Sequence, residues 1–406
     1  MMDLSRTEYV VIKSSKRVEK LLHVFVLITL VFGTFFYDFV DQRLGFSFID
    51  ELQTLLLLCL TFLFGQKKLF REFYLFLLVS FFYLAKSVLF PNNVLPAVFV
   101  DFIIQLKPFI AFYGAFILYR PFTNKHRDYV KHLCLILAIC IFPIALNTEI
   151  TEYFFGHVSR LATCFELLSM YYLFLSKQTK HDIKISCIIA ACALLTLRSK
   201  AFGFVSIYIL MMLFAPKLLD RKHVKKTKLF FLGIITISAS LYFAWDKIYF
   251  YFIEGASRED DMFARPALYY YGVSILNNYP LFGTGLGTYA TFASAKYYSP
   301  IYTIYGLRYV NGLSDDPNIG GGFISDTFFP ELVQFGYVGI FLFFCFWYKR
   351  YSQIRLSLKG NKINYLLGIS ILIFFFIESV GDSTFTQNRG FTAMLLLGFI
   401  CSSKKS

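Results

Sequence analysis

The most informative part of the sequence is 265–339, which begins RPALYYYGVSILNNYPLFGTGLGTY (265–289) and ends FISDTFFPELVQFGYVG (323–339). It belongs to the only long polar interval of a very apolar sequence. An arginine–proline pair opens the stretch, a glycine-rich segment follows, and the acidic Asp326 precedes the next apolar run. We expect the apolar runs on both sides to form a scaffold, and this stretch to contribute the chemistry.

The composition indicates a membrane protein. Of the 406 residues, 57% are hydrophobic and 16% are charged, whereas about a quarter of the residues of a soluble domain are charged. The net charge of +14 could suggest a nucleic-acid partner. Its Lys and Arg residues lie in short loops between apolar runs, however, so we expect no such partner. Because the eight cysteines form no metal-binding CxxC pattern, we predict neither a metal nor a cofactor.

Apolar runs of about 17–22 residues predict an all-α polytopic membrane protein with about twelve transmembrane helices. The runs lie near 21–38, 49–65, 72–90, 98–119, 129–147, 161–177, 183–198, 201–216, 229–246, 326–348, 362–380 and 389–402. Between the seventh and eighth runs, Arg198-Ser199-Lys200 predicts a turn at the membrane surface, because two cations are costly inside lipid. The chain thus divides into a scaffold of about nine helices (1–245), a long outer loop (246–325) and three C-terminal spans with a short tail (326–406).

The distribution of basic residues predicts the orientation in the membrane. Twenty-eight of the 40 Lys and Arg residues lie in the loops and termini on one side of the predicted spans. Basic loops face the cytoplasm, so both termini should be cytoplasmic and the interval 246–325 should face outward.

Within this interval, we predict that 265–279 forms a short amphipathic helix on the membrane surface. Pro266 is suited to its first turn and Pro280 ends it. Gly283, Gly285 and Gly287 then predict a turn; a phosphate cradle is less suited, because the strand that precedes such a loop is missing. The segment 311–322 is predicted to be a flexible loop.

Four cations near the outer ends of predicted spans are candidates for binding a pyrophosphate: Arg160, Arg198, Lys200 and Arg265. Arginine forms bidentate hydrogen bonds with phosphate oxygens and remains charged at any working pH. Lysine lacks this planar fork, so Lys200 is the weaker candidate. The alternative for each is an anchor to lipid headgroups.

Candidate acidic and aromatic residues complete the predicted site. Asp326 can act as a general base or bind sugar hydroxyls, which is compatible with an N-cap of the tenth span by Ser325 or Asp326. Glu331 should face the protein interior, because a charge is costly in lipid. Arg389, with Glu378 and Asp382, forms either a structural ion pair or part of the site. Twelve of the 28 tyrosines lie in 246–325. Tyr269 and Tyr270 among them suit either a sugar-binding surface or an interfacial aromatic belt.

Arg265-Pro266, PLFGTGLGTY (280–289) and ELVQFGYVG (331–339) together resemble the O-antigen polymerase and ligase superfamily, and TLRSKAF (196–202) resembles its other arginine-bearing segment. The resemblance covers the C-terminal third. It implies a metal-independent, inverting glycosyltransferase of the bacterial cytoplasmic (inner) membrane that uses undecaprenyl-pyrophosphate-linked oligosaccharides as donor and acceptor. It further implies roughly twelve spans, an outward-facing site, pyrophosphate binding by Arg198 and Arg265, and a chain-length regulator protein as a partner.

One departure from the family pattern favours a polymerase of O-antigen, capsule or exopolysaccharide. The ligases have a histidine–asparagine pair where this sequence has Ser325-Asp326, and no histidine lies near that position in the sequence. A ligase that transfers polymer to lipid A core remains an alternative. A lipid-linked-sugar transporter is another, although a transporter would usually have charges inside its spans and two related halves.

Overall fold

A computed structural model describes residues 2–219, 249–255, 262–358 and 360–403, together with positions 234, 238, 242 and 245. These residues form helices and turns and include no β-strand. Eight of the described helices are long and apolar enough to cross a membrane. They confirm the predicted class, a helical polytopic membrane protein.

The helices before the polar interval are α1 (Met2–Leu30), α2 (Tyr37–Leu44), α3 (Ile49–Phe64), α4 (Phe70–Leu89), α5 (Leu95–Leu118), α6 (Asn124–Ala145), α7 (Thr148–Phe155), α8 (Val158–Leu175), α9 (Lys180–Cys192) and α10 (Ser199–Leu219). Those within and after it are α13 (Ala264–Asn278), α14 (Phe292–Lys296), α15 (Pro300–Ile304), α16 (Gly336–Ser357), α17 (Lys362–Val380) and α18 (Asn388–Ser402). Short 3-10 turns at Ala193–Thr196 and Phe329–Phe335 follow α9 and precede α16.

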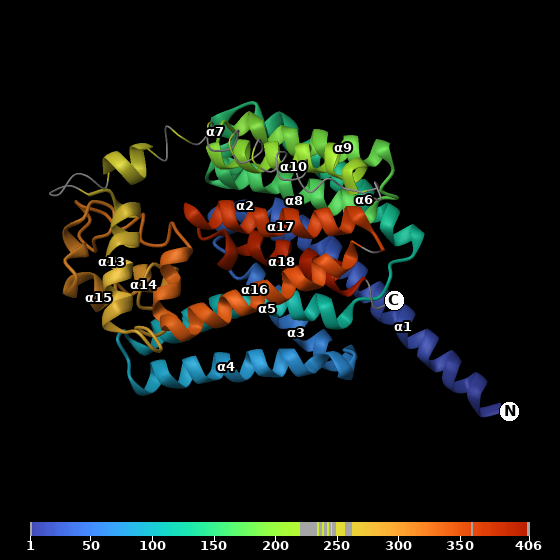
Figure 1. Cartoon of the computed structure of the whole chain (residues 1–406), viewed down its shortest axis with the longest axis horizontal. Helices are drawn as coiled ribbons and strands as arrows, with labels where there is room; N and C mark the ends of the chain where they lie inside the picture. The colour runs from blue at the N-terminus through green and yellow to red at the C-terminus, as the bar shows by residue number, and fades with distance from the viewer. Residues whose placement is uncertain are drawn as a thin grey trace.

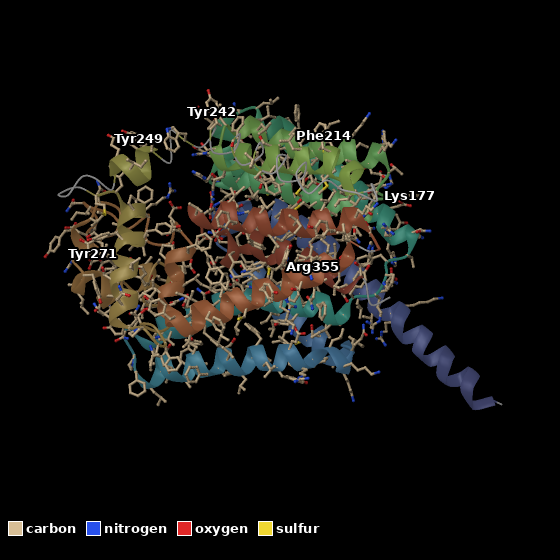
Figure 2. The ribbon with its side chains drawn as sticks, in the orientation of Figure 1. Lys177, Phe214, Tyr242, Tyr249, Tyr271 and Arg355 are labelled. Carbon is tan, nitrogen blue, oxygen red and sulfur yellow. The ribbon has the colours of Figure 1, made fainter. Side chains whose placement is uncertain are left out.

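The long helices form a bundle, and α13 runs across one end of it (Figure 1). Helix α5 packs against α3, α4 and α18, while α17 packs against α10 and α16. The short helices α14 and α15 lie beside α13, and α1 leaves the bundle at the opposite end, where the C-terminus also lies. Figure 2 shows the same separation in side chains, with Tyr271 of α13 at one end and Lys177 at the other.

Three of the twelve predicted spans form helices shorter than the rest. Helices α3, α9 and α18 contain 16, 13 and 15 residues. At 1.5 Å per residue, α9 is about 20 Å long, less than the ~30 Å of a hydrocarbon core. The predicted span 229–246 lies outside the described residues except for four single positions. By contrast, α17 has the predicted bounds of 362 and 380.

The predicted span 326–348 overlaps a continuous helical stretch, Phe329–Ser357, that is long and apolar enough to cross a membrane and within which α16 begins at Gly336. The preceding apolar residues form the 3-10 turn Phe329–Phe335, which packs against α13. The amides of Tyr337 and Val338, in the first turn of α16, donate to the carbonyls of Pro280 and Leu281 at 2.7 and 3.2 Å. We call the described residues 262–335 the outer unit, after the predicted outer loop 246–325.

The outer unit has a small apolar core of its own. Leu268 and Ile275 of α13 are fully buried and belong to one cluster with Tyr289 and Val333. Protein thus covers much of the apolar face that was predicted to lie on the membrane, whereas Val273 remains exposed. Helix α13 itself matches the predicted helix to within one residue at each end.

The segment 311–322 is more ordered than the predicted flexible loop. The amide of Ser314 donates to the carbonyl of Gly320 at 2.9 Å, and the amide of Gly312 donates to that of Ile319 at 3.2 Å. Leu313 is fully buried in the core of the outer unit. Backbone hydrogen bonds therefore close this loop on itself.

Helix α18 lies in the interior of the bundle. Each of its fifteen residues is buried. Gly398 allows a close approach to α5, because a Cβ at this position would lie 2.5 Å from the carbonyl oxygen of Phe112. Arg389, in the first turn of α18, is thereby held at the end of the bundle near α13.

Candidate functional site

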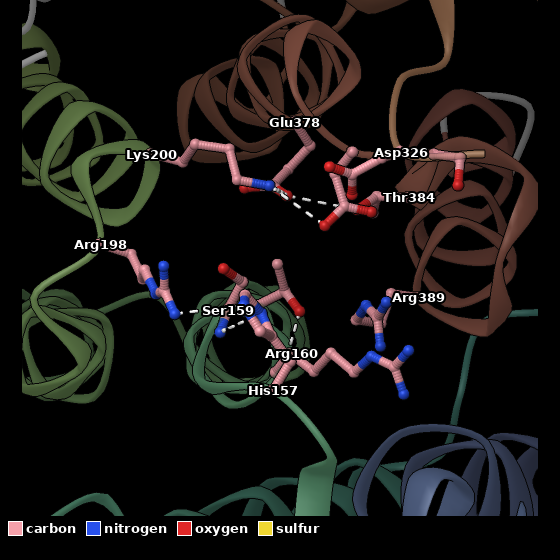
Figure 3. Close-up of polar contacts among 12 residues, drawn as sticks. His157, Ser159, Arg160, Arg198, Lys200, Asp326, Glu378, Thr384 and Arg389 are labelled. Atoms are coloured by element: carbon pink, nitrogen blue, oxygen red, sulfur yellow. Dashed lines mark hydrogen bonds and ion pairs between the residues drawn. The ribbon is translucent and has the colours of Figure 1, made fainter. Parts of the chain in front are cut away.

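Ten charged or titratable side chains gather where α8, α10, α17 and α18 meet the outer unit, and we call this group the polar cluster. Its members are Asp38, His157, Arg160, Arg198, Lys200, Arg265, Asp326, Glu378, Asp382 and Arg389. Figure 3 shows that the labelled members come from several helices and surround one region. The cluster brings together six of the nine predicted site residues, although they are widely separated in sequence.

Arg265 and Asp326 form an ion pair within the cluster. Nε of Arg265 donates to Oδ2 of Asp326 at 2.9 Å, and Nη2 contacts the same oxygen. The guanidinium also lies 5.9 Å from the ring centre of Phe323. Burial raises the pKa of Asp326, although Arg265 opposes the shift. The predicted N-cap role of Asp326 is wrong, because α16 begins only at Gly336.

Lys200 is held by two carboxylates at the end of α17. Its Nζ lies 2.8 Å from Oε2 of Glu378 and 3.2 Å from Oδ2 of Asp382. Thr384 donates to the same oxygen of Glu378 at 3.2 Å. Burial alone would raise the pKa of Asp382, but the positive charges of Lys200 and Arg389 lower it. Asp382 is therefore ionised at neutral pH.

Arg160 and Arg389 share the carboxylate of Asp38. Nη1 of Arg160 donates to Oδ1 at 2.7 Å, and Nη1 of Arg389 lies 3.6 Å from Oδ2. The side chain of Asp38 is 2% exposed, so the two arginines supply its only ion pairs among the described residues. Sequence reasoning missed Asp38, because a single acid at the end of an apolar run resembles any interfacial residue.

Arg198 differs from the other cations of the cluster. Among the described residues, its guanidinium contacts a histidine, with Nη2 3.1 Å from Nε2 of His157, whereas the other four cations contact carboxylates. Burial and then the charge of Arg198 lower the pKa of His157, so the ring is neutral at pH 7. Arg198 is thus the least neutralised cation and the best placed to accept an anionic group.

A buried acid, Glu166, lies beside the cluster on α8. It is 0% exposed, and neither carboxylate oxygen has a hydrogen-bond partner among the described residues. Its charged neighbours are Glu378 and Lys200. The sequence contained a usable signal for this residue, because an acid inside a predicted span is costly in lipid and usually functional.

The two predicted tyrosines lie on α13 in different settings. Tyr269 donates its hydroxyl to the carbonyl of Val380 at 2.9 Å, so it ties α13 to the end of α17 beside the cluster. Tyr270 is 63% exposed and meets Tyr271 edge-on, with ring centres 5.3 Å apart. Tyr270 therefore remains a candidate for contact with a sugar, and Tyr269 is foremost a structural link.

Glu331 lies apart from the cluster, beneath the glycine turn. It is 2% exposed and accepts a hydrogen bond from Gln105 at 2.9 Å. Gln105 also lies 3.4 Å from Asp101, which accepts the amide of Gly287 at 2.9 Å. Gln334 accepts the same amide at 3.1 Å. We therefore assign Glu331 to a structural network rather than to substrate binding.

The glycine segment is a turn, as predicted, and does not cradle a phosphate. Gly283, Gly285 and Gly287 all have positive φ, at 66°, 98° and 71°. The amides that a cradle would offer are already used: Gly285 donates to the Gln334 carbonyl at 3.0 Å, and Leu286 donates to Oγ of Ser87 at 2.9 Å. The turn instead joins the outer unit to α4 and α5.

Comparisons with known proteins identify no relative. No protein-family model matches the sequence, and neither curated proteins nor solved structures give a significant match. Among the described residues, no group of three or more His, Cys, Asp or Glu is arranged to hold a metal ion. What the protein does must therefore follow from the polar cluster and from the sequence motifs.

Proposed function

We propose that the protein is a polymerase that joins undecaprenyl-pyrophosphate-linked oligosaccharide repeat units. The observation that supports it best is the convergence of Arg160, Arg198, Lys200, Arg265 and Arg389 in one cluster at an end of the helical bundle. Figure 3 labels all of these residues except Arg265. Carboxylates pair with four of these five cations, and Arg198 is the cation that contacts a neutral histidine instead. A pyrophosphate, which carries several negative charges, would therefore bind first at Arg198. The apolar helices around it suit a substrate with a polyprenyl chain.

In the proposed reaction, an acceptor hydroxyl attacks the anomeric carbon of the donor sugar from the face opposite the leaving group. The new glycosidic C–O bond forms as the bond from the anomeric carbon to the pyrophosphate oxygen breaks, with inversion. The bonding electrons leave with the pyrophosphate, whose growing charge Arg198 and Arg265 stabilise. Each such contact typically contributes about 3–4 kcal/mol. Asp326 accepts the hydroxyl proton, which requires its carboxylate to turn from Arg265 toward the acceptor.

The topology that goes with this function has twelve spans, with both termini in the cytoplasm and the outer unit on the opposite face. Helix α9 would cross together with the 3-10 turn Ala193–Thr196, and α3 and α18 together with flanking residues. The position of α13 at the bundle end opposite both termini supports this orientation (Figure 1). The excess of Lys and Arg residues in the loops on the same side as the termini supports this orientation independently.

A ligase that transfers polymer to lipid A core is the second candidate, and His157 is the observation that favours it. No histidine lies near Asp326 in the sequence, yet His157 contacts Arg198 and has Asp382 and Lys200 among its charged neighbours. His157 therefore supplies a histidine in the polar cluster, although the sequence has none near Asp326. Among the described residues, no hydrogen bond or ion pair joins His157 to Asp326, so the polymerase is the better-supported proposal.

Deletion of the gene separates the two functions. A polymerase consumes two lipid-linked repeats per bond, so its loss should leave single repeat units and no long chains. Loss of a ligase should instead leave long chains on undecaprenyl pyrophosphate, detached from core. Gel analysis of total and lipid-A-linked polysaccharide distinguishes these outcomes, and an unchanged profile would contradict both proposals.

A further inference from the structure

A groove between α4, α5 and α16 lies apart from the polar cluster. Its volume is about 330 Å³, and most of its lining is apolar. Phe76 and Val79 of α4, Phe109 of α5 and Leu342 and Phe346 of α16 form part of its walls. These three helices are among those suited to cross a membrane, so the groove lies at the depth of the lipid chains.

The groove extends along about half of a bilayer core. Glu72 and Tyr83 both line it and stand eleven residues apart on α4. At 1.5 Å per residue this separation is about 17 Å, against ~30 Å for the whole hydrocarbon core. The length therefore suits a hydrocarbon chain that belongs to one leaflet.

One mouth of the groove carries an excess positive charge. Glu72 accepts from Lys349 at 2.9 Å through Oε1 and from Arg350 at 2.7 Å through Oε2. Two cations thus share one carboxylate. The Lys349 side chain is 53% exposed and that of Arg350 only 1%.

The guanidinium of Arg350 also has unused donors. Its Nε and Nη1 are buried without a hydrogen-bond acceptor among the described residues. The rings of Phe112 and Phe346 lie 4.7 and 5.0 Å from it and stabilise the charge through their faces. They supply no oxygen acceptor, however, so the site is built for one further anionic group.

We propose that this groove binds an anionic phospholipid, with its phosphate at Lys349 and Arg350 and one acyl chain between α4, α5 and α16. The substrate lipid of the proposed reaction is not the expected occupant. Its pyrophosphate must reach the polar cluster, whereas Lys349 and Arg350 lie near the opposite end of the long helices. The inference stands without the proposed function, because it rests on a different set of residues.

Native mass spectrometry of the full chain tests the headgroup contact. The detergent-purified protein is mixed with equal amounts of phosphatidylglycerol and phosphatidylcholine, and bound lipid is measured. We expect the wild type to retain phosphatidylglycerol selectively. Lys349→Gln should weaken that binding by about tenfold, the value of one charge-assisted hydrogen bond. Arg355→Gln, an exposed cation on the same helix outside the groove, should bind as the wild type does.

A second pair of variants tests whether the groove binds an acyl chain. Val79→Phe fills the groove, whereas Leu78→Phe places the same ring on an exposed position of α4 that does not line it. Only Val79→Phe should lose phosphatidylglycerol, with both variants monodisperse and unfolding cooperatively. Equal retention of phosphatidylcholine, unchanged binding in both Lys349→Gln and Val79→Phe, or displacement by undecaprenyl phosphate would each overturn the proposal.

Discussion

The guanidinium of Arg265 and the carboxylate of Asp326 are joined by a 2.9 Å hydrogen bond, although 61 positions separate the two residues. The pair connects the first turn of α13 to the segment that leads into the 3-10 turn before α16. It also couples Arg265, which is proposed to stabilise the leaving group, with Asp326, the proposed base, because the charge on each residue stabilises the charge on the other.

Arg265→Lys and Arg265→Ala should both abolish polymer and leave the protein in the membrane. Lysine keeps the charge but cannot make the two parallel hydrogen bonds of the guanidinium. The measurement is polysaccharide chain length on gels, with an immunoblot of the membrane fraction. Arg308→Ala is the control, because Arg308 forms an exposed ion pair with Asp315 elsewhere in the outer unit. Normal polymer from Arg265→Ala would reduce Arg265 to an interfacial anchor.

Asp326→Asn should yield short chains, and polymer synthesis by the wild type should fall on acidification. A base works ionised, so activity is present above its pKa and is lost as the pH falls through it. Burial raises the pKa of Asp326 above its ordinary value, about 3.9. The loss should therefore occur at a higher pH than for an ordinary aspartate, measured as initial rates on lipid-linked repeats. A loss only at much lower pH would point to Asp382, whose pKa is lowered.

Lys200→Met should destabilise the protein by about 3–5 kcal/mol, because it leaves Glu378 charged and unpaired in a nearly fully buried position. The double variant Lys200→Met/Glu378→Gln should recover part of that loss. Denaturant unfolding in detergent gives the four free energies of the cycle. If Lys200→Met and Lys200→Met/Glu378→Gln were equally stable, the unpaired charge of Asp382 alone would account for the loss of stability.

Gly283→Ala should prevent accumulation of folded protein. Gly283 has a φ of +66°, and a Cβ would overlap the backbone of Val333, Gln334 and Gly336. Gly306→Ala is a matched control with a φ of +73° and no atom within 4 Å of the added Cβ. It should cost only the left-handed strain of about 1–2 kcal/mol. Similar expression and melting temperatures for both variants would contradict the close packing of the turn.

Reporter fusions should establish the proposed orientation. A reporter that is active only outside the cytoplasm should be active after residue 300 and silent after residues 223 and 355. The reason is the distribution of Lys and Arg residues between the two sides. The reverse pattern would place the polar cluster on the cytoplasmic face and remove the proposed substrate from its reach.

The length and hydrophobicity of the apolar runs predicted most of the helices, because a helix that crosses a lipid bilayer must be both long and apolar. The bounds of α17 agree to the residue. The same rule did not predict the conformation of 329–335, which forms a 3-10 turn. Val333 of this turn belongs to the core of the outer unit, whereas Leu332 belongs to the core of the bundle. Hydrophobicity does not distinguish these two environments.

The sequence motifs predicted the arginines of the site but not their partners. The ion pair between Arg160 and Asp38 joins residues 122 positions apart, and the contact between Arg198 and His157 joins residues 41 positions apart. No local pattern encodes such pairs. They follow from the packing of α2, α8 and α10 in three dimensions.

The buried position of α18 has a consequence for biogenesis. Helices α5, α8 and α17, against which α18 packs, are all synthesised before it. Until the fifteen residues of α18 leave the ribosome, the faces of these helices that contact α18 in the folded protein have no partner from it. A nascent chain interrupted before Asn388 would expose those faces, together with Asp38 lacking its contact to Arg389. Quality-control proteases of the membrane could recognise this exposed binding site for α18, together with Asp38 paired only with Arg160. Both features would distinguish an incomplete chain from the folded protein.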